Sequence, residues 1–204
     1  MPDTGRDSQS GTPHPPPEAL LDVRYVRPYR HNMRLIFLFF AAATAAPLAA
    51  QSDAFVEQAG SANEVELAQF SPAVEASARV IQAGDGHIAR VTQEGGGLVD
   101  VEQRGAGNLL AGLAMGTGDP ASAALVAGGS TLVLRQSDGG NRAFVEQRDG
   151  GFAEISQAGF DNVALLSQGG GPGNQAFIDQ AGAATAQVTQ FGADNTARIT
   201  QTPF

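Results

Sequence analysis

SQAGFDNVALLSQ, residues 156–168, and TAQVTQFGADNTARITQ, residues 185–201, share one pattern of residue types. The pattern is Q-x-G-x-x-N-x-A-x-x-x-Q, and it begins at Gln157 in the first segment and at Gln190 in the second. Between the two, residues 173–182 read GNQAFIDQAG, so the glutamines recur at nearly regular steps. The same offsets twice in one chain indicate an internal repeat, which has to be interpreted before any local feature.

The repeat extends over most of the chain. Towards the N-terminus the glutamines recur at similar steps, at Gln58, Gln69, Gln82, Gln93 and Gln103, and again at Gln136, Gln147 and Gln157. They are missing between Gln103 and Gln136, a gap as long as several ordinary steps. That stretch is rich in Gly and Ala and predicts one or more degenerate repeats with a looped-out insertion around residues 116–120.

Within one repeat the residue types alternate. In residues 195–201, NTARITQ, one face carries Asn, Ala, Ile and Gln, and the other carries Thr, Arg and Thr. Alternation over about seven residues predicts a strand. Each repeat then closes with small and polar residues, such as SDGGN at residues 137–141. Gly, Asn and Asp accept the positive φ that a chain reversal requires.

Strands of this length joined by short turns predict an all-β fold. We expect a β-solenoid of stacked strand–turn–strand repeats, about 22 residues per unit, with two parallel sheets face to face. Stacking brings the same residue type of successive repeats to within roughly 4.8 Å. A buried amide without a partner costs roughly 1–3 kcal/mol, and an amide that hydrogen-bonds to its stacked copy avoids that cost.

The repeat therefore predicts two sets of site residues. The predicted self-assembly ladder consists of Gln58, Asn63, Gln69, Gln82, Gln93, Gln103, Asn108, Gln136, Asn141, Gln147, Gln157, Asn162, Gln168, Asn174, Gln180, Gln190, Asn195 and Gln201. The predicted turn glycines are Gly60, Gly84, Gly105, Gly159, Gly182 and Gly192.

The start of the chain differs in composition. Residues 1–32 hold six of the 11 prolines and show no apolar periodicity, which predicts a disordered segment or one that lies upstream of a true start at Met33. Residues 33–50 begin with Met-Arg, continue with LIFLFF and end in small residues, as secretory signal peptides do. The alternative for residues 1–32 is an extended, charged beginning of that signal peptide.

The apolar run is short and interrupted by Pro47, which argues against a transmembrane anchor. Cleavage after Ala50 leaves residues 51–204 as the solenoid domain, with an irregular stretch near 109–130. We expect no membrane span after this cleavage.

Charge and cysteine content exclude several classes of function. Residues 51–204 carry seven arginines, no lysine and 17 Asp and Glu, a net charge of −10. Such a chain is a poor partner for nucleic acid or an anionic membrane. The chain has no cysteine. An exported protein without disulfides needs another source of stability, and stacked backbone hydrogen bonds with dry packing supply one.

The repeat offers little catalytic chemistry. His87 is the one histidine after residue 50, and it occupies the Asn position of its repeat, which favours a structural role. One histidine without cysteine excludes a typical zinc site and a Ser-His-Asp triad. We predict no enzyme activity, no metal site and no cofactor.

A recurring aromatic residue has two interpretations. Phe55, Phe144 and Phe177 lie in the pattern A-F-[VI]-[ED]-Q and point outward by alternation. They form either a surface for lateral contact or side chains that turns of the same chain cover.

The repeat unit, after a predicted signal peptide, resembles the curlin repeat of bacterial curli subunits. The match is complete at residues 157–168 and 190–201; Val65 replaces the Ala of the first unit, and the unit that starts at Gln103 matches in its first half. The resemblance covers most of residues 54–201. It leaves open whether the chain is a major or a minor, nucleating subunit.

The resemblance implies a secreted structural subunit that self-assembles into curli-like amyloid fibres for adhesion and biofilm matrix. The implied location is the extracellular cell surface, as a fimbrium or pilus. The implied partners are further copies of the chain, a second curli subunit and an outer-membrane secretion apparatus.

Two alternatives remain open at this point. A monomeric extracellular β-solenoid that binds carbohydrate or a cell-surface partner would show the same repeat but capped edges. An exported β-helix enzyme would need clustered carboxylates that the pattern does not supply.

Overall fold

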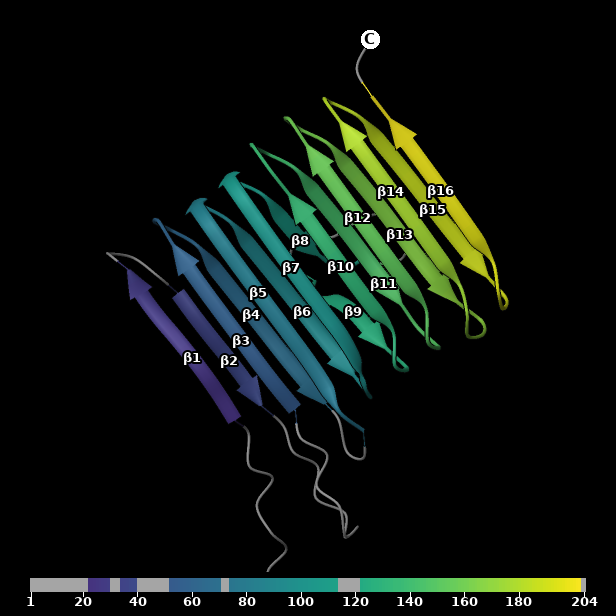
Figure 1. Cartoon of the computed structure of the whole chain (residues 1–204), viewed down its shortest axis with the longest axis horizontal. Helices are drawn as coiled ribbons and strands as arrows, with labels where there is room; N and C mark the ends of the chain where they lie inside the picture. The colour runs from purple at the N-terminus through teal and green to yellow at the C-terminus, as the bar shows by residue number, and fades with distance from the viewer. Residues whose placement is uncertain (1–21, 30–33, 40–51, 71–73, 114–121, 203–204) are drawn as a thin grey trace, which may run out of the picture.

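The computed structural model describes residues 22–29, 34–39, 52–70, 74–113 and 122–202. Within these ranges every regular element is a β-strand (Figure 1). The strands are β1 (Asp22–Tyr29), β2 (Arg34–Phe39), β3 (Ser52–Ala59), β4 (Glu64–Phe70), β5 (Ala76–Asp85), β6 (Ile88–Glu94), β7 (Gly97–Ala106), β8 (Leu109–Ala111), β9 (Ala124–Ala127), β10 (Thr131–Gln136), β11 (Arg142–Gln147), β12 (Phe152–Ala158), β13 (Val163–Gly169), β14 (Gln175–Ala181), β15 (Thr185–Phe191) and β16 (Thr196–Gln201).

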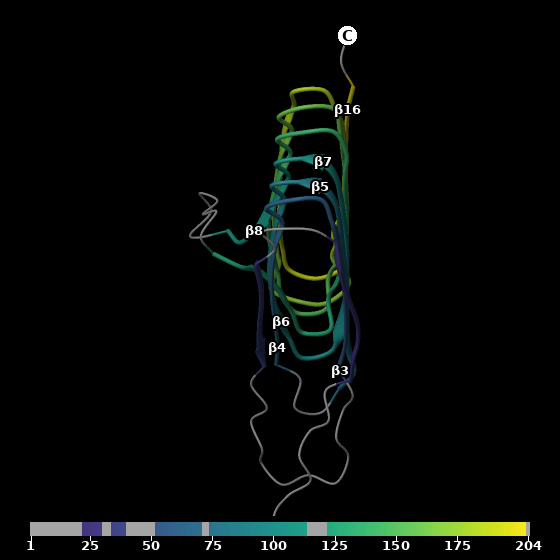
Figure 2. The same cartoon turned by 90° about the vertical axis from the view of Figure 1, so that its left-hand side faces the viewer.

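The strands form two parallel sheets. Sheet 1 has the order β1-β3-β5-β7-β10-β12-β14-β16, and sheet 2 has the order β2-β4-β6-β8-β11-β13-β15, with β9 between β6 and β11. Successive strands of the chain alternate between the sheets, and Figure 2 shows the two layers joined by arches. The predicted β-solenoid with two parallel sheets is confirmed.

The repeat length is visible in the strand register. Gln58 pairs with Gln82, and Gln82 pairs with Gln103. Further along the same sheet, Gln157 pairs with Gln180. One turn of the solenoid therefore takes about 22 residues, as the sequence predicts.

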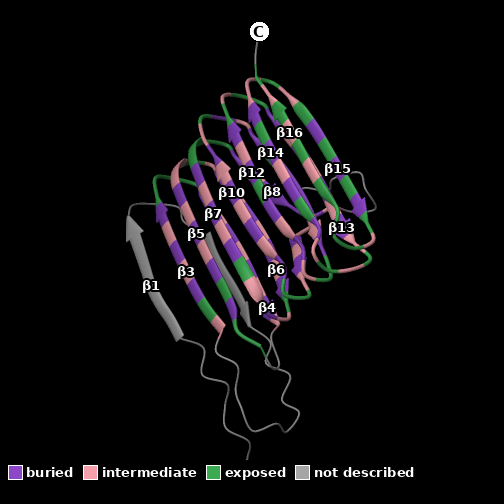
Figure 3. Cartoon of the chain, turned by 45° about the vertical axis from the view of Figure 1, so that its right-hand side comes forward, coloured by how far each residue is buried: buried purple, intermediate pink, exposed green. Residues whose placement is uncertain are grey.

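The core lies between the sheets because the side chains alternate. In β13 the buried residues are Ala164, Leu166 and Gln168, and the residues between them are partly exposed. Figure 3 shows the same alternation in strand after strand. Burying one Leu, Ile or Val side chain contributes about 1.5–3 kcal/mol, so the stacked aliphatic rows are the main source of stability.

The arches need glycine where two turns stack closely. Gly84 has φ +129°, and a Cβ there would lie 1.8 Å from the carbonyl oxygen of Gly105. All six predicted turn glycines have positive φ. Glycine is the residue type that satisfies both the backbone conformation and the close approach of the next turn.

The irregular stretch is one turn of the solenoid with an insertion. Strand β8 pairs with the first half of β11 and β9 pairs with its second half, so the two share one place in sheet 2. The chain leaves that place after Ala111 and returns at Ala124 (Figure 2). Gln103 and Gln136 are direct neighbours in sheet 1. The long interval between them is thus one turn of ordinary length plus residues 112–123; the predicted loop at 116–120 lies outside the described residues.

Two strands precede the predicted cleavage site. In the uncleaved chain β1 pairs with β3, and β2 pairs with β4. The register of β1 shifts between Val23 and Val26. The predicted removal of residues 1–50 would take both strands away and leave β3 and β4 at the N-terminal end of the two sheets.

Candidate functional site

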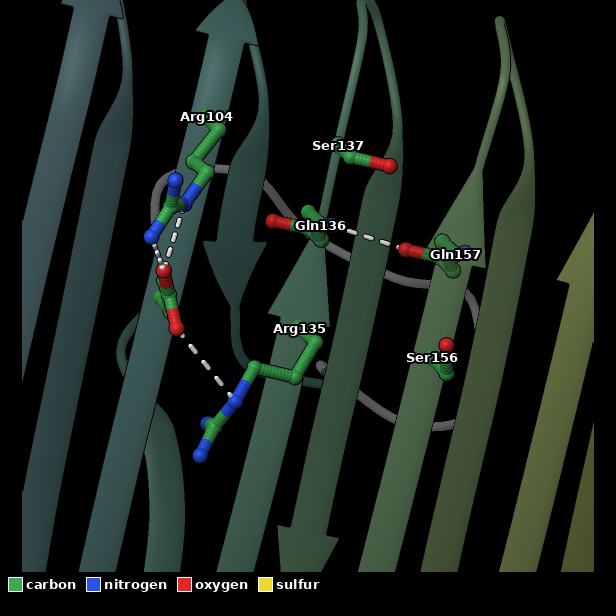
Figure 4. Close-up of a pocket in the computed structure, with 7 residues that line it drawn as sticks. Arg104, Arg135, Gln136, Ser137, Ser156 and Gln157 are labelled. Atoms are coloured by element: carbon green, nitrogen blue, oxygen red, sulfur yellow. Dashed lines mark hydrogen bonds and ion pairs between the residues drawn. The ribbon is translucent and has the colours of Figure 1, made fainter.

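Sheet 1 carries an unbroken ladder of glutamine side chains. Each Nε2 donates to the Oε1 of the next glutamine over 2.6–2.9 Å, in the order Gln58, Gln82, Gln103, Gln136, Gln157, Gln180, Gln201. Figure 4 shows one of these bonds, from Gln136 to Gln157. All the amides point the same way along the solenoid, so the ladder has a donor end and an acceptor end.

The glutamines also tie the two sheets together. The second N–H of Gln157 donates to the carbonyl oxygen of Arg142 in β11 over 3.1 Å. Gln180 makes the same bond to Val163 in β13. Each glutamine lies at or near the C-terminal end of its strand, shortly before the chain turns towards the other sheet. The amide is therefore hydrogen-bonded within the protein where the buried core meets the arch.

Sheet 2 carries a second glutamine ladder with a break. Gln69 donates to Gln93 over 3.0 Å, and Gln147 donates to Gln168, which donates to Gln190. Val126 of β9 lies between the two parts, opposite Gln93 on one side and Gln147 on the other. The sequence pattern did not identify Val126, because the insertion hides its place in the repeat.

The arches contain a row of asparagines. The Oδ1 of Asn108 accepts from the backbone N–H of Asn141, whose own Oδ1 accepts from that of Asn162. The Nδ2 of each donates to the carbonyl oxygen four residues earlier, as Asn162 does to Ala158. These bonds hold the arch in the shape that the next arch stacks on.

A second, shorter row lies in the arches at the other end of the strands. Asn174 accepts from both the backbone and the side chain of Asn195. One step further towards the N-terminus lies Gly151, whose N–H donates to the Oγ of Ser130. Ser130 takes an Asn position that the sequence pattern missed; its signal was a small polar residue directly before a strand.

His87 replaces an asparagine in the first row. It is fully buried; its N–H donates to Asn63 Oδ1, and its Nδ1 accepts from the N–H of Asn108. Its Nε2 lies 3.3 Å from the carbonyl oxygen of Ala83, four residues earlier. The ring thus acts as acceptor and donor where Asn has its oxygen and nitrogen, which requires the neutral form with the proton on Nε2. Burial lowers the pKa of His87, although the hydrogen bond to Ala83 and the nearby Asp85 oppose this.

The charged residues of the outer face form ion pairs. Asp100 accepts from Arg79 and Arg135 over 2.8 and 2.7 Å. Glu102 pairs with Arg135 and Arg104, and these groups line the open depression in Figure 4. Burial raises the pKa of Asp100, but the two arginine hydrogen bonds outweigh it, and the pKa lies below its usual range. This is a solvated, mutually neutralised surface.

The three recurring phenylalanines have different surroundings. Phe144 is buried, at the point of sheet 2 opposite Ala111, where the chain leaves the strand. Phe55 and Phe177 are partly exposed on sheet 1. The guanidinium of Arg198 lies 4.6 Å above the ring of Phe177. The chain itself covers one of the three and partly shields another, so they do not form one continuous aromatic surface.

Strands β15 and β16 each leave one edge open at the C-terminal end of the described chain. Strand β16 is hydrogen-bonded to β14 on one side, and β15 to β13 on one side, and no described strand lies beyond either (Figure 1). Residues that are buried in the inner strands become partly exposed here, such as Ala197 and Ile199. Both glutamine ladders run up to this edge, at Gln190 and Gln201.

The described residues contain no group of three His, Cys, Asp or Glu placed to hold a metal ion. Two depressions in this part of the chain are open areas of the sheet surface, lined by paired charges and by ladder glutamines. The same ranges contain no helix that is long and apolar enough to cross a membrane.

A family model described as the curlin associated repeat matches residues 152–182. The matched segment comprises β12, β13 and β14. No curated protein and no solved structure matches the chain.

Proposed function

We propose that this chain, whose residues 152–182 match the curlin associated repeat, is a secreted structural subunit that self-assembles into curli-like amyloid fibres. In this role it serves adhesion and the biofilm matrix at the extracellular cell surface and has no enzymatic activity. Its partners are further copies of itself, a second curli subunit and an outer-membrane secretion apparatus. Residues 33–50 direct its export and are removed.

One observation carries the proposal: within the described chain the repeat stops at β15 and β16 without a cap. The outer N–H and C=O groups of these strands have the same arrangement as those of every inner strand. Such an edge is a template for another strand of the same kind. A second copy would gain a full set of parallel backbone bonds, a continued aliphatic core and two further ladder bonds, which are the features of cross-β assembly.

The amide ladder is the part that we expect to make assembly specific. Substituting Gln157, Gln168, Gln190 and Gln201 together by Ala should lengthen the lag of fibre formation in a thioflavin assay. The matched control replaces the outward neighbours of the same glutamines by Ala, at Ser156, Ser167, Thr189 and Thr200. The control variant should keep the wild-type lag.

Seeding separates this function from a monomeric binding role. Preformed fibre ends should shorten the lag of fresh protein, and the fibres should give reflections near roughly 4.8 and 10 Å. Protein that stays monomeric for days at high concentration would overturn the proposal. An unchanged lag in the quadruple glutamine variant, with the fold intact by circular dichroism, would remove the ladder as the driving element.

A further inference from the structure

Two buried acceptors at the N-terminal end of the ladders have no partner in the described part of the chain. They are the Oε1 atoms of Gln58 and Gln69, two residues that are 4% and 5% exposed. In the uncleaved chain the register places Pro28 opposite the first and Phe39 opposite the second. Neither residue type has a side-chain donor. The acceptor ends of both ladders are therefore built but unfilled, even with β1 and β2 in place.

The other end of each ladder presents the matching donor. Gln201 and Gln190 each use one N–H of the amide for a backbone carbonyl oxygen, of Thr185 and Gln175 respectively. An amide has two N–H donors. In every inner glutamine of sheet 1 the nitrogen also bonds to the next glutamine, and at these two the next glutamine is absent from the described chain.

The number of strands decides which donor meets which acceptor. From β3 onward, the described chain gives sheet 1 seven strands and sheet 2 six places, because β8 and β9 share one. Every strand pairs with the one two places before it in the chain. The place after β16 therefore lies beside β15, in sheet 2, and the following place lies beside β16, in sheet 1.

We propose that successive copies join end to end with a half-turn between them, so that β3 of the new copy pairs with β15 and β4 with β16. In this joint Gln190 donates to Gln58 and Gln201 donates to Gln69 of the next copy. The inference rests on the proposed function and adds the polarity and symmetry of the fibre. The joint requires that β1 and β2 be removed from the edges of β3 and β4, which cleavage after Ala50 would achieve.

Without the half-turn, one strand is missing at each joint. If β3 paired with β16, the place beside β15 would stay empty, and the backbone groups of β15 would face a gap. Unpaired buried backbone groups are strongly unfavourable. A half-turn about the solenoid axis exchanges the two sheets and reverses the strand direction, so all strands at the joint remain parallel to their neighbours.

The side chains at the joint are complementary. With Gln201 opposite Gln69, Ile199 meets Leu67 and Arg198 meets Glu66, since both pairs lie at equal distances from the glutamines. Inside the chain, Arg90 is the neighbour of Glu66 in the sheet and pairs with it and with Glu64. Arg198 would flank the same two carboxylates from the other side.

Charge also opposes the reverse joints. The N-terminal strands β3 and β4 carry the four acidic residues Asp53, Glu57, Glu64 and Glu66, and the C-terminal strands β15 and β16 carry one charge, on Arg198. A joint between two N-terminal ends would bring like charges together, which is destabilising at strand spacing. A joint between two C-terminal ends would bring donor amides to donor amides.

Disulfide trapping tests the joint, because the chain has no cysteine of its own. Four single variants are needed, Thr189→Cys, Thr200→Cys, Glu57→Cys and Ala68→Cys, all at outward positions. Each is made in the full chain with a protease site inserted after Ala50 and cut after purification. Pairs are mixed, assembled and oxidised mildly, and the disulfides are identified by peptide mass spectrometry.

The half-turn joint predicts disulfides 189–57 and 200–68. A joint without the half-turn predicts the crossed pair 200–57. The other crossed pair, 189–68, is expected in neither joint, because the empty place beside β15 would separate Thr189 from the incoming β4. The predicted pairs should exceed the crossed pairs about tenfold or more. Double variants within one chain, Ser167→Cys with Thr189→Cys and Asp179→Cys with Thr200→Cys, are neighbours in the sheets and serve as positive controls.

Each outcome is informative. Fibres that contain the crossed disulfide 200–57 overturn the half-turn, and fibres that contain disulfides 200–200 or 57–57 overturn the polarity; the proposed function survives both. Absence of fibres and of intermolecular disulfides, while the controls within one chain form, overturns the joint and the proposed function together. Before the protease cut we expect the 189–57 and 200–68 disulfides to be at least about tenfold rarer, because β1 and β2 hold the places of the incoming strands.

Discussion

Gln93 and Gln147 belong to the same ladder of sheet 2, but within the described chain the nitrogen of the first and the oxygen of the second are buried without a hydrogen-bond partner on either side of Val126. The two orphaned groups are those that a glutamine at position 126 would bind. A buried, unsatisfied polar group costs about 1–3 kcal/mol. These two groups therefore destabilise the turn that contains the insertion.

We predict that Val126→Gln stabilises the protein, because one side chain supplies the missing acceptor and the missing donor. The free energy of unfolding should rise by about 1–2 kcal/mol, after allowance for the lost apolar contacts of Val126. Urea unfolding of freshly prepared monomer measures this. Val126→Leu has similar bulk without an amide and should show no gain; an equal gain in both variants would refute the ladder explanation.

Deletion of residues 112–123 should leave the fold intact. Ala111 and Ala124 occupy neighbouring places in one strand of sheet 2, so their direct connection restores a turn of ordinary length. Surface insertions affect the free energy of unfolding weakly, and we expect a change within about 1 kcal/mol. Deletion of the equally long segment 163–174 removes β13 and should abolish the cooperative transition, which circular dichroism during heating detects.

His87 should make stability depend on pH in the mildly acidic range. Its folded pKa lies below the usual value near 6.5, so the unfolded chain binds the proton first as the pH falls. The contribution of neutral His87 to the free energy of unfolding is complete above about pH 6.5. It declines as the pH falls from there to the folded pKa. Protonation of Nδ1 would also turn the acceptor of the Asn108 N–H into a donor.

The matched control is His87→Asn, which restores the residue type of the row. Its free energy of unfolding should stay flat between about pH 7 and 5, where wild type declines. Losses below about pH 4 should persist in both proteins, since Asp85 and Asp100 have lowered pKa values and lose their hydrogen bonds there. Identical profiles above pH 5 would exclude His87 as the cause.

Two turn glycines should differ in their tolerance of a methyl group. Gly105 has φ +95°, and an added Cβ would lie 1.8 Å from the carbonyl oxygen of Asp138, whereas Gly107 has φ +66° and open space around it. Gly105→Ala should cost about 3 kcal/mol or more, and Gly107→Ala about 1 kcal/mol, from backbone strain alone. Thermal unfolding of both variants compares them; equal losses would show that stacking of the arches does not matter.

The repeat in the sequence was sufficient to predict the solenoid, its period, its two parallel sheets and the recurring positions from which the ladders are built. These features follow from local sequence patterns. Alternation of residue types defines the strand, and Gly and Asp define the turn. A single repeat can bury its apolar face only against its own copies, so the repeats stack. The Asn position of His87 also followed from spacing alone.

The tertiary structure decided what spacing cannot express. Register between strands far apart in the chain divides the glutamines into two ladders, places Val126 in one of them, and compresses the interval from Gln103 to Gln136 into one turn with an insertion. It also sets the direction of every amide and leaves Gln58 and Gln69 without donors among the described residues. Those features depend on which strand lies beside which, and a local pattern that is the same in every repeat does not carry that information.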